Sequence, residues 1–337
     1  MLSIQNLLTQ YQKHNVVDIG YTETTGSEYF SEYVNWVNQN NHLPLKYLEG
    51  EKLEKREDLK NYWQECESSL VFLFSYKNIQ SHLSGIYSKN KKWNGLKIAS
   101  YTLGFDGEDY HNYIAKILNQ IGSELQREFP GLEFKLALDT QAVIDRDLAF
   151  RSGLGWFGKN SMFISRKFGS FTIIGSLLLN QKLPLSQITL DVDHCGQCTK
   201  CIEACPTNAI DPQSRTIVAK DCISTFTIEQ FKMDSIPSEK MSLMSGYVFG
   251  CDICQEVCPW NKRIDRYNIS EINLNDRQNE ITNYFLFRDK RELYNQLNNS
   301  SERSFRNQFK NTPFERSGRR GILKNLIFYF KELNIFS

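Results

Sequence analysis

The most informative part of the sequence reads Cys195-Gly196-Gln197-Cys198-Thr199-Lys200-Cys201-Ile202-Glu203-Ala204-Cys205-Pro206. Its cysteines follow the spacing C-x2-C-x2-C-x3-C-P, in which three thiolates bind one [4Fe–4S] cluster and the fourth binds a second cluster nearby. The first three cysteines wrap a loop around one cubic cluster. The stretch therefore predicts a module that holds two iron–sulfur clusters.

A second, shorter run supplies the remaining ligands. It reads Cys251-x2-Cys254-x3-Cys258-Pro259, and Val248 stands where the motif would have its first cysteine. Cys222 lies between the two runs, and we expect it to replace the missing ligand. One predicted set is Cys195, Cys198, Cys201 and Cys258, and the other is Cys205, Cys222, Cys251 and Cys254.

Zinc and disulfide bonds are the alternative uses of these cysteines. Zinc sites use pairs of close ligands that converge on one tetrahedral ion, whereas the spacing in this chain suits a larger cluster. Disulfides belong to oxidising compartments, and the N-terminus does not resemble a signal peptide. We therefore expect iron–sulfur clusters in a reducing cytosol.

The composition is that of an ordinary soluble protein. Its 337 residues suggest about two or three domains, and 40% hydrophobic residues suffice for packed cores. The formal net charge is +1, so affinity for nucleic acid would have to come from local patches. No apolar run approaches the ~20 residues needed to cross a bilayer. We expect a cytoplasmic monomer without membrane contact.

Helical and strand-like patterns alternate along the first part of the chain. Short apolar runs typical of buried strands occur at residues 16–20, 69–75, 97–101 and 132–138. Residues 109–129 have the pattern of an amphipathic helix, and residues 142–151 that of a second helix ended by Ser152-Gly153. Residues 161–165 and 170–178 suggest a hairpin. This alternation predicts a sheet with helices packed against it.

We divide the chain into three parts with an overall α+β fold. These are an N-terminal α/β domain (1–185), a bacterial ferredoxin-like 2[4Fe–4S] module (186–265) and a short helical region (266–337). Within 303–324, seven Lys or Arg accompany one acidic residue, and three phenylalanines interleave with them. This stretch is either a solvated helix pair with its aromatics in the core or a phosphate-binding face. Two clusters form an electron relay, so we expect the electron acceptor in the N-terminal domain.

Four further features of the chain have a structural or a functional interpretation. The glycines of 153–158 allow close backbone approach, either to a packed element or to a ligand. His111 stands where a cobalt-binding motif would have its histidine, but Ile114 replaces the glycine of that motif, so we expect a packed or hydrogen-bonded histidine. His194 is expected to donate a hydrogen bond that tunes a cluster. The charged residues 51–58 suit a solvated helix face.

In four stretches the chain resembles the epoxyqueuosine reductase family. They are Leu138-Asp139-Thr140, Arg151-Ser152-Gly153-Leu154-Gly155-Trp156-Phe157-Gly158-Lys159-Asn160, Cys222-Ile223-Ser224 with Thr227-Ile228-Glu229, and Gly250-Cys251-Asp252-Ile253-Cys254-Gln255-Glu256-Val257-Cys258-Pro259-Trp260-Asn261. The resemblance implies a cobalamin-dependent, two-cluster enzyme whose N-terminal domain is a cobalamin-binding fold related to reductive dehalogenases. Such enzymes remove the epoxide oxygen of epoxyqueuosine at the tRNA wobble position, the last step of queuosine synthesis.

The resemblance also implies roles for single residues. Asp139 matches the proton donor of the family, and a carboxyl against an apolar corrin face would be desolvated, which raises its pKa. Its alternative role is to cap the helix expected near residue 142. Cobalamin contacts are implied for Asp139 and for Arg56, Ala99, Phe163, Ile174, Ser224, Asp252 and Ile253, with Phe163 and Ile174 contributing backbone. Contacts to tRNA are expected at Lys232, Arg316, Arg319, Arg320 and Lys324.

The implied partners are a tRNA bearing epoxyqueuosine and an external low-potential electron donor. Two other functions stay open. One is a reductive dehalogenase-like corrinoid enzyme acting on a small molecule, against which the basic C-terminal stretch argues. The other is a non-enzymatic electron carrier, although simple ferredoxins need far less chain than the residues 1–185 that precede the clusters.

Overall fold

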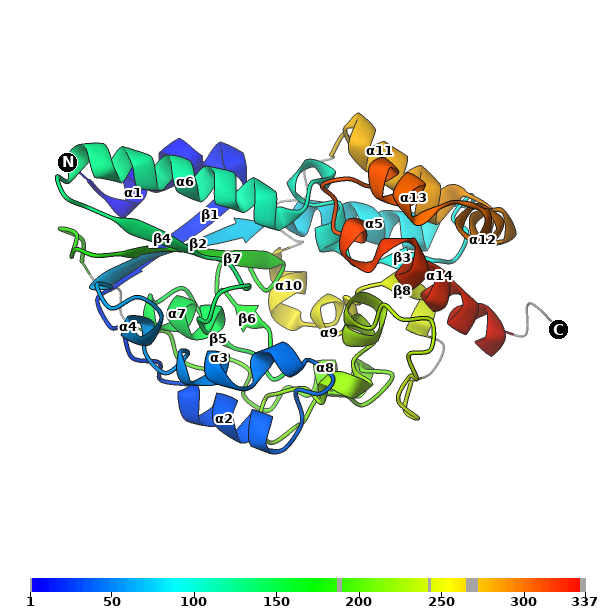
Figure 1. Ribbon diagram of the computed structural model, residues 1–337, viewed down its shortest axis with the longest axis horizontal. Helices are drawn as coiled ribbons and strands as arrows, with labels where there is room; N and C mark the ends of the chain where they lie inside the picture. The colour runs from blue at the N-terminus through cyan, green and yellow to red at the C-terminus, as the bar shows by residue number, and fades with distance from the viewer. Residues whose placement is uncertain (1, 187–189, 242–243, 265–271, 334–337) are drawn as a thin grey trace.

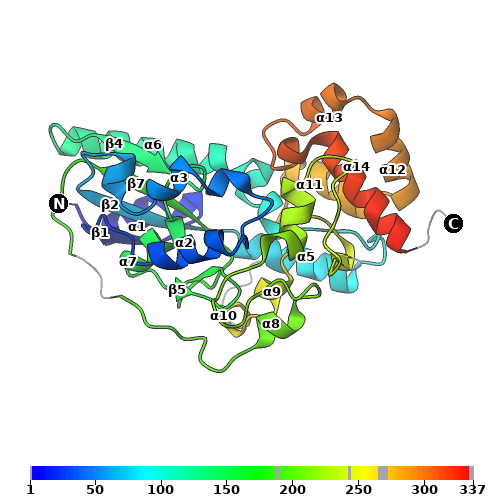
Figure 2. The same ribbon diagram turned by 60° about the horizontal axis from the view of Figure 1, so that its bottom comes forward.

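The computed structural model of the protein describes residues 2–186, 190–241, 244–264 and 272–333. A lobe built on a sheet lies beside a lobe built mainly of helices (Figure 1). The cysteine-rich segment runs along the place where the two lobes meet, as a second view also shows (Figure 2). Within these described ranges, no helix combines the length and the apolar character that a bilayer crossing requires.

The first lobe is organised on a four-stranded antiparallel sheet with the strand order β1-β2-β7-β4. Its strands are β1 (Val16–Thr22), β2 (Ser68–Ser75), β4 (Phe134–Ala137) and β7 (Thr172–Leu179). Because side chains alternate along a strand, Phe72 and Phe74 face one side of the sheet while Val71 and Leu73 face the other. Both faces of the sheet are therefore buried.

Helices cover both faces of the sheet (Figure 1). On one face, α1 (Ile4–Tyr11) and α6 (Tyr110–Glu128) pack their apolar stripes against the strands. Asp109 caps α6, since its side chain accepts a hydrogen bond from the His111 N–H. The other face carries α4 (Leu59–Tyr62), α7 (Asp145–Arg151), β5 (Trp156–Phe157) and β6 (Phe163–Ile164), with α2 (Phe30–Asn38) and α3 (Glu51–Glu54) farther out.

The second lobe has a separate core around a two-stranded parallel pair. Here β3 (Lys97–Ile98) pairs with β8 (Tyr247–Phe249). The surrounding helices are α5 (Lys77–Lys89), α11 (Asp276–Thr282), α12 (Lys290–Asn299), α13 (Glu302–Gln308) and α14 (Phe314–Glu332). The cysteine-rich segment contributes α8 (Lys200–Ala204), α9 (Ile253–Glu256) and α10 (Pro259–Ile264).

This second core unites residues from all three parts of the expected domain division. Leu83 and Ile98 come from the first part, Phe249 from the second, and Phe285 and Leu326 from the third. The expected boundary at 265–266 lies outside the described residues. The division into 1–185, 186–265 and 266–337 therefore stays a prediction.

Several expected elements are confirmed and others are wrong. The strands at 16–20, 69–75 and 132–138 and the helix at 109–129 are confirmed as β1, β2, β4 and α6. The expected sheet with helices packed against it is confirmed, and its strands run antiparallel, a direction that the alternation of helices and strands does not fix. The strand at 97–101 is only β3, followed by a 3-10 turn. The hairpin of 161–165 with 170–178 is reduced to a bridge between Ser165 and Gly169.

The glycine-rich turn owes its composition to close packing. A Cβ atom at Gly155 would lie 2.0 Å from the carbonyl oxygen of Ile164, and one at Gly158 would lie 2.6 Å from the Ile164 side chain. Both positions face β6, which pairs with β5 next to the turn. Of the two interpretations of these glycines, approach to a packed element is the one observed.

We expect Gly155→Ala to lower the free energy of unfolding by about 2 kcal/mol, because the backbone of β6 must move to admit the methyl group. Gly85→Ala is the matched control, since a Cβ at Gly85 in α5 meets nothing within 4 Å. The control should gain up to about 1 kcal/mol from helix propensity. Urea unfolding followed by circular dichroism measures both. Equal stability of the Gly155 variant and the wild type would contradict the packing interpretation.

Candidate active site

A cavity of about 650 Å³ lies between the two lobes. One wall carries polar side chains from the start of α6 and from the turn after β4. Another wall carries cysteines from the cluster module, and isoleucines line much of the remainder. The lining includes Arg56, Tyr110, His111, Asp139, Cys205, Cys222, Cys251, Cys254, Glu229 and Arg316.

The cysteines divide between two cavities. Cys205, Cys222, Cys251 and Cys254 all line the cavity just described. Cys195, Cys198, Cys201 and Cys258 line a second cavity of about 320 Å³, together with Lys159 and Trp260. These are the two sets that the spacing of the sequence predicts, and Cys222 lies with Cys205, Cys251 and Cys254. Cys66 is fully buried and packs in the core beneath the sheet.

The ionisation of the thiols follows the same grouping. Burial, and then the charges of Cys258 and Cys195, raise the pKa of the Cys201 thiol to about 11. Burial, and then Cys222 and Cys205, likewise raise the pKa of Cys254. Such thiols become thiolates when a metal centre displaces their protons. Among the described residues, no group of three His, Cys, Asp or Glu side chains could hold a single metal ion.

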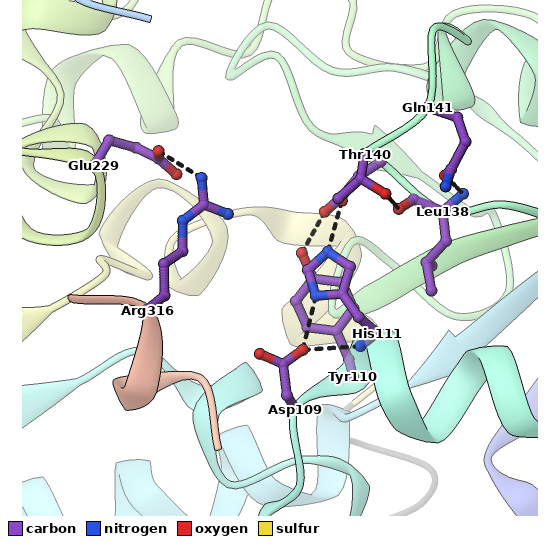
Figure 3. A network of polar contacts seen from close by, with 9 residues as sticks. Asp109, Tyr110, His111, Leu138, Thr140, Gln141, Glu229 and Arg316 are labelled. Atoms are coloured by element: carbon purple, nitrogen blue, oxygen red, sulfur yellow. Dashed lines mark hydrogen bonds and ion pairs between the residues drawn. The ribbon is translucent and has the colours of Figure 1, made fainter. Parts of the chain in front are cut away.

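His111 forms the centre of a hydrogen-bonded network on the opposite wall (Figure 3). Its Nδ1 lies 2.7 Å from Oδ1 of Asp109, and its Nε2 lies 2.7 Å from Oδ1 of Asp139. The hydroxyl of Tyr110 donates to the other carboxylate oxygen of Asp139. The expectation of a hydrogen-bonded His111 is thus confirmed. One imidazole connects the partly exposed carboxylate of Asp109 to the more exposed carboxylate of Asp139, and both line the cavity.

Two carboxylates hold the His111 ring in its charged form. Burial alone would lower the pKa of His111, but the hydrogen bonds and charges of Asp109 and Asp139 outweigh it and raise the pKa to about 9. Burial raises the pKa of Asp109, but hydrogen bonds from His111 outweigh this and leave the pKa below its usual value. Burial, and then the charge of Asp139, raise the pKa of Tyr110 well above 10. At neutral pH His111 is therefore an imidazolium, Asp109 a carboxylate and Tyr110 a neutral phenol.

The alternative role of Asp139 as a helix cap is wrong. The helix expected near residue 142 begins only at Asp145, so Asp139 does not cap it. The Asp139 side chain is 49% exposed and is hydrogen-bonded to His111 and Tyr110, and its desolvation against a corrin face stays a prediction. Its backbone φ of 50° lies in the left-handed region, which Asp tolerates better than most residues. The turn thereby directs the carboxylate towards α6.

Sequence reasoning missed a second carboxyl near Asp139. Burial, and then the charge of Asp139, raise the pKa of Asp145 to about 7. Oδ1 of Asp145 is buried without a hydrogen-bond partner among the described residues. Sequence reasoning also missed Tyr110 as a partner of Asp139. The only available signal was that Tyr110 and His111 adjoin a helix cap, which does not reveal what they meet across the cavity.

Most residues expected to contact cobalamin line the cavity. Arg56, Ala99, Ser224, Asp252 and Ile253 all do so. The Arg56 guanidinium is buried, donates to the carbonyl of Lys52 at 2.7 Å and lies over the Tyr33 ring, so the solvated-face interpretation of 51–58 is wrong for Arg56. Phe163 and Ile174 pack in the core beneath the sheet, whereas their neighbours Met162 and Ile173 line the cavity. Side-chain alternation explains this displacement.

This lining fits a corrinoid cofactor. A large macrocycle needs apolar walls with a few polar groups at its edge. Ile173, Ile217 and Ile223 supply apolar wall, and Arg56 and Arg316 supply cations at the edge. Asp252 is not free to serve as an additional charge, because both the N–H and the hydroxyl of Ser100 donate to it at 2.7 Å.

Arg316 connects the cavity to a basic groove of about 850 Å³. It pairs with Glu229 at 2.7 Å, apart from the His111 network (Figure 3). Burial raises the pKa of Glu229, while Arg316 opposes that shift. The groove is lined by the expected tRNA-contacting residues Lys232, Arg316, Arg319 and Arg320, and also by Arg306, Phe231 and Met233. Phe231 and Met233 are exposed hydrophobic side chains.

Lys324 was expected to meet phosphates, and its surroundings contradict this. The side chain is buried, and its Nζ donates to the carbonyls of Phe226 at 2.7 Å and Gln230 at 2.5 Å. Burial lowers the pKa of Lys324 to about 7. The phenylalanines of the same stretch are buried as well. Lys324 thus lies on the buried side of α14, although lysine usually faces solvent. The sequence alone did not reveal this burial.

His194 lies beside the first set of cysteines. Its ring contacts Trp156 and Trp260, and its Nε2 lies 2.9 Å from Oδ1 of Asp191. It lines the same cavity as Cys195, Cys198, Cys201 and Cys258. The expected hydrogen bond from His194 to a cluster stays a prediction.

Comparison with known proteins agrees with this geometry. Residues 194–261 match the family model of the 4Fe-4S double cluster binding domain. Residues 56–140 match the family model described as epoxyqueuosine reductase QueG. Both matches include residues that line the central cavity, Arg56 to Asp139 in one and the cysteines in the other.

Two curated relatives and one solved structure extend the comparison. The epoxyqueuosine reductase of Leadbetterella byssophila is 33% identical over 293 residues, which cover 87% of this chain and 86% of the relative. That of Cyclobacterium marinum is 36% identical over 228 residues, covering 68% and 69%. The structure of epoxyqueuosine reductase from Streptococcus thermophilus has the same fold, with a TM-score of 0.79 and 21% identity over 98% of this chain and 81% of that one. This chain belongs to the epoxyqueuosine reductase family.

Proposed function

We propose that the protein reduces epoxyqueuosine to queuosine in tRNA, taking electrons through two [4Fe–4S] clusters to cobalamin. One observation carries the proposal. A single cavity is lined both by four cysteines and by the carboxylate of Asp139 with its hydrogen-bonded partners. Removal of an epoxide oxygen needs both electrons and protons at one place, and these walls supply the groups for each.

The residues of the cavity have separate tasks in this reaction. Bound cobalamin would supply a strongly nucleophilic, reducing metal centre. Arg56, Ala99, Ser224, Asp252 and Ile253 would hold it, together with the backbone at Phe163 and Ile174. Asp139 would deliver a proton to the oxygen that leaves. The apolar lining would exclude water, which strengthens electrostatic interactions within the cavity.

The two cysteine sets define the direction of electron flow. Cys205, Cys222, Cys251 and Cys254 would hold the cluster next to the reaction, since they line the central cavity. Cys195, Cys198, Cys201 and Cys258 would hold the cluster that an external low-potential donor reduces, since they line a separate cavity. Potentials of such clusters are set by hydrogen bonds and solvent exposure.

A basic groove would hold the tRNA beside the cavity. Lys232, Arg316, Arg319 and Arg320 line the groove, and Arg316 also reaches the cavity. Phosphates in the groove would thus bring the wobble nucleoside to the reacting groups. We omit Lys324 from this set because it is buried. The solved structure of an epoxyqueuosine reductase with a tRNA-Tyr epoxyqueuosine-modified stem loop has the same fold as this chain, with a TM-score of 0.72.

The remaining expectations are part of the same proposal. The protein would act in the cytoplasm as a monomer, where tRNA and reduced carrier proteins are available. Residues 1–185 would form the catalytic part, 186–265 the cluster module and 266–337 the basic helical region. A small-molecule dehalogenation or simple electron transfer would leave the basic groove without a use.

We expect Cys222→Ser protein, reconstituted anaerobically, to lose about one cluster's worth of iron, roughly four atoms per chain. Without this thiolate the set that lines the central cavity has only three ligands. Cys66→Ser is the matched control, because Cys66 is buried in an apolar core away from both sets, and it should lose none. Iron and acid-labile sulfide analysis measures the difference. Equal iron in the two variants would remove Cys222 from the ligand set.

We expect the double variant Lys232→Ala/Arg320→Ala to weaken tRNA binding and to flatten its salt dependence. Both side chains are exposed and line the groove. Each lost phosphate contact reduces the slope of log K against log salt by about 0.7–0.9, so the pair should reduce it by about 1.4–1.8. Lys91→Ala/Lys92→Ala removes the same charge from exposed positions outside the groove and should leave the slope unchanged. Identical slopes for the two double variants would mean that the groove is a solvated surface that does not bind phosphates.

We expect wild-type protein with a chemical reductant to convert epoxyqueuosine in tRNA to queuosine, detected by mass spectrometry of nucleosides. Asp139→Asn keeps the size of the side chain but removes the acid. It should lower the rate by at least about 10²-fold, as is typical for loss of a general acid. Cobalamin and iron contents, measured on the same samples, should match the wild type. A near wild-type rate in the variant would mean that the proton comes from another group.

A further inference from the structure

The proposed reaction consumes more protons than Asp139 can hold. Converting an epoxide to an alkene breaks two C–O bonds, forms one C=C double bond, takes up two electrons and two protons, and releases one water. The electrons come from the external one-electron donor through the clusters. A single carboxyl supplies one proton at a time, so a second proton must reach the leaving oxygen during the same turnover.

The His111 network has the connections that such a supply needs. Nε2 of His111 lies 2.7 Å from Asp139, and Nδ1 lies 2.7 Å from Asp109. Asp109 also accepts from the backbone N–H of His111, so the imidazole is held by its own helix cap. The side chains of Asp109 and His111 are about one quarter exposed, whereas that of Asp139 is about one half exposed. All three side chains line the cavity, and the network thus runs from the less exposed carboxylate of Asp109 to the more exposed one of Asp139.

We propose that His111 holds the first proton that Asp139 delivers, is then reprotonated by solvent at its partly exposed ring, and passes this second proton to Asp139 within the same turnover. His111 acts through Asp139 and does not itself touch the substrate, and Asp109 keeps the ring oriented and charged. In this arrangement Asp139 is a carboxylate between turnovers, and the proton is on Nε2 of His111. The inference rests on the proposed function and adds the residue that supplies its protons.

The other charged groups near the network are less suited to this task. The hydroxyl of Tyr110 donates to Asp139, but its raised pKa keeps it from giving up a proton near neutrality. Asp145 influences Asp139 through its charge, yet no hydrogen bond joins their side chains among the described residues. Glu229 also acts on Asp139, and Arg316 acts on Asp109, through charge alone. Among the described residues, only His111 is both hydrogen-bonded to Asp139 and able to give up a proton near neutrality.

The first test measures protonation without catalysis. The chain has five histidines, so proton NMR of the reconstituted full-length protein gives few imidazole signals, and His111→Gln identifies the one from His111. We expect this signal to titrate at a pKa of about 9. In Asp109→Asn and in Asp139→Asn, its pKa should move towards the ordinary 6.5, since each variant removes one carboxylate partner. A wild-type His111 that titrates near 6.5 would overturn the proposal.

The second test follows the rate of a single turnover by pre-reduced protein between about pH 7 and 10. Loss of a required proton from His111 lowers the wild-type rate about tenfold per pH unit above the pKa of His111. His111→Gln keeps a hydrogen-bond donor but cannot hold the proton. It should be at least about tenfold slower at pH 7 and should lack the alkaline fall. Tyr110→Phe, which removes a different hydrogen bond to Asp139, should keep that fall.

The outcomes separate this inference from the proposed function. If Asp139→Asn is slow but His111→Gln keeps the wild-type rate and pH profile, the reaction stands and the role of His111 is wrong. If Asp145→Asn, rather than His111→Gln, abolishes the alkaline fall, the proton is held by Asp145. If wild-type protein forms no queuosine at all, the proposed function fails, and the NMR titration still decides whether His111 holds the proton.

Discussion

The carboxylate of Asp252 joins the cysteine loop after β8 to the segment after β3, and the cavity depends on this junction. It accepts two hydrogen bonds of 2.7 Å from Ser100, which follows β3, while its own neighbours Cys251 and Cys254 line the cavity. Burial raises the pKa of Asp252 to about 6, although the bonds from Ser100 oppose that shift. A buried carboxylate is costly unless it is hydrogen-bonded, so separation of the cysteine loop from Ser100 is strongly disfavoured. The β3–β8 pair reinforces the same junction.

This junction places two different chemistries opposite each other. The cysteine wall is built from a loop after β8, from Cys222 and from Cys205 at the end of α8. The proton-carrying wall is built from the cap of α6 and the turn after β4. Neither wall is complete within one continuous segment of the chain. The core of the second lobe contains residues from all three expected parts. This shared core explains how such distant segments are held in place relative to one another. The reaction site is therefore a product of tertiary packing around the cluster module.

The same arrangement explains the position of Arg316. It belongs to α14, whose buried face includes Leu326 and Phe330, and it extends from there to Glu229 at the cavity. Arg319 and Arg320 of the same helix line the groove outside. A helix anchored in the second core can thus present charge to a polyanion on one side and to the cavity on the other.

The sequence was most informative where local spacing carries the chemistry. The cysteine pattern predicted two sets of four, and the two cavities contain the same sets, Cys222 included. The apolar strands and the helix at 109–129 were also predictable, because alternation and helical periodicity are local properties.

Features set by long-range packing were not predictable from local patterns. The antiparallel order of the sheet depends on connections that the pattern does not describe. Burial of Lys324 depends on two carbonyls near residues 226 and 230, far away in sequence. The partnership of His111 with Asp139 joins α6 to the turn after β4, so a residue expected to be merely hydrogen-bonded became the centre of the network.

The most direct test of the central claim is anomalous diffraction at the iron and cobalt edges from anaerobic crystals of the reconstituted protein. We expect two iron-cluster peaks, one at each cysteine set, and one cobalt peak in the central cavity between the Cys222–Cys254 wall and Asp139. A cobalt peak elsewhere in a fully loaded crystal would contradict the claim that this cavity is the reaction site. So would the absence of iron at Cys205, Cys222, Cys251 and Cys254.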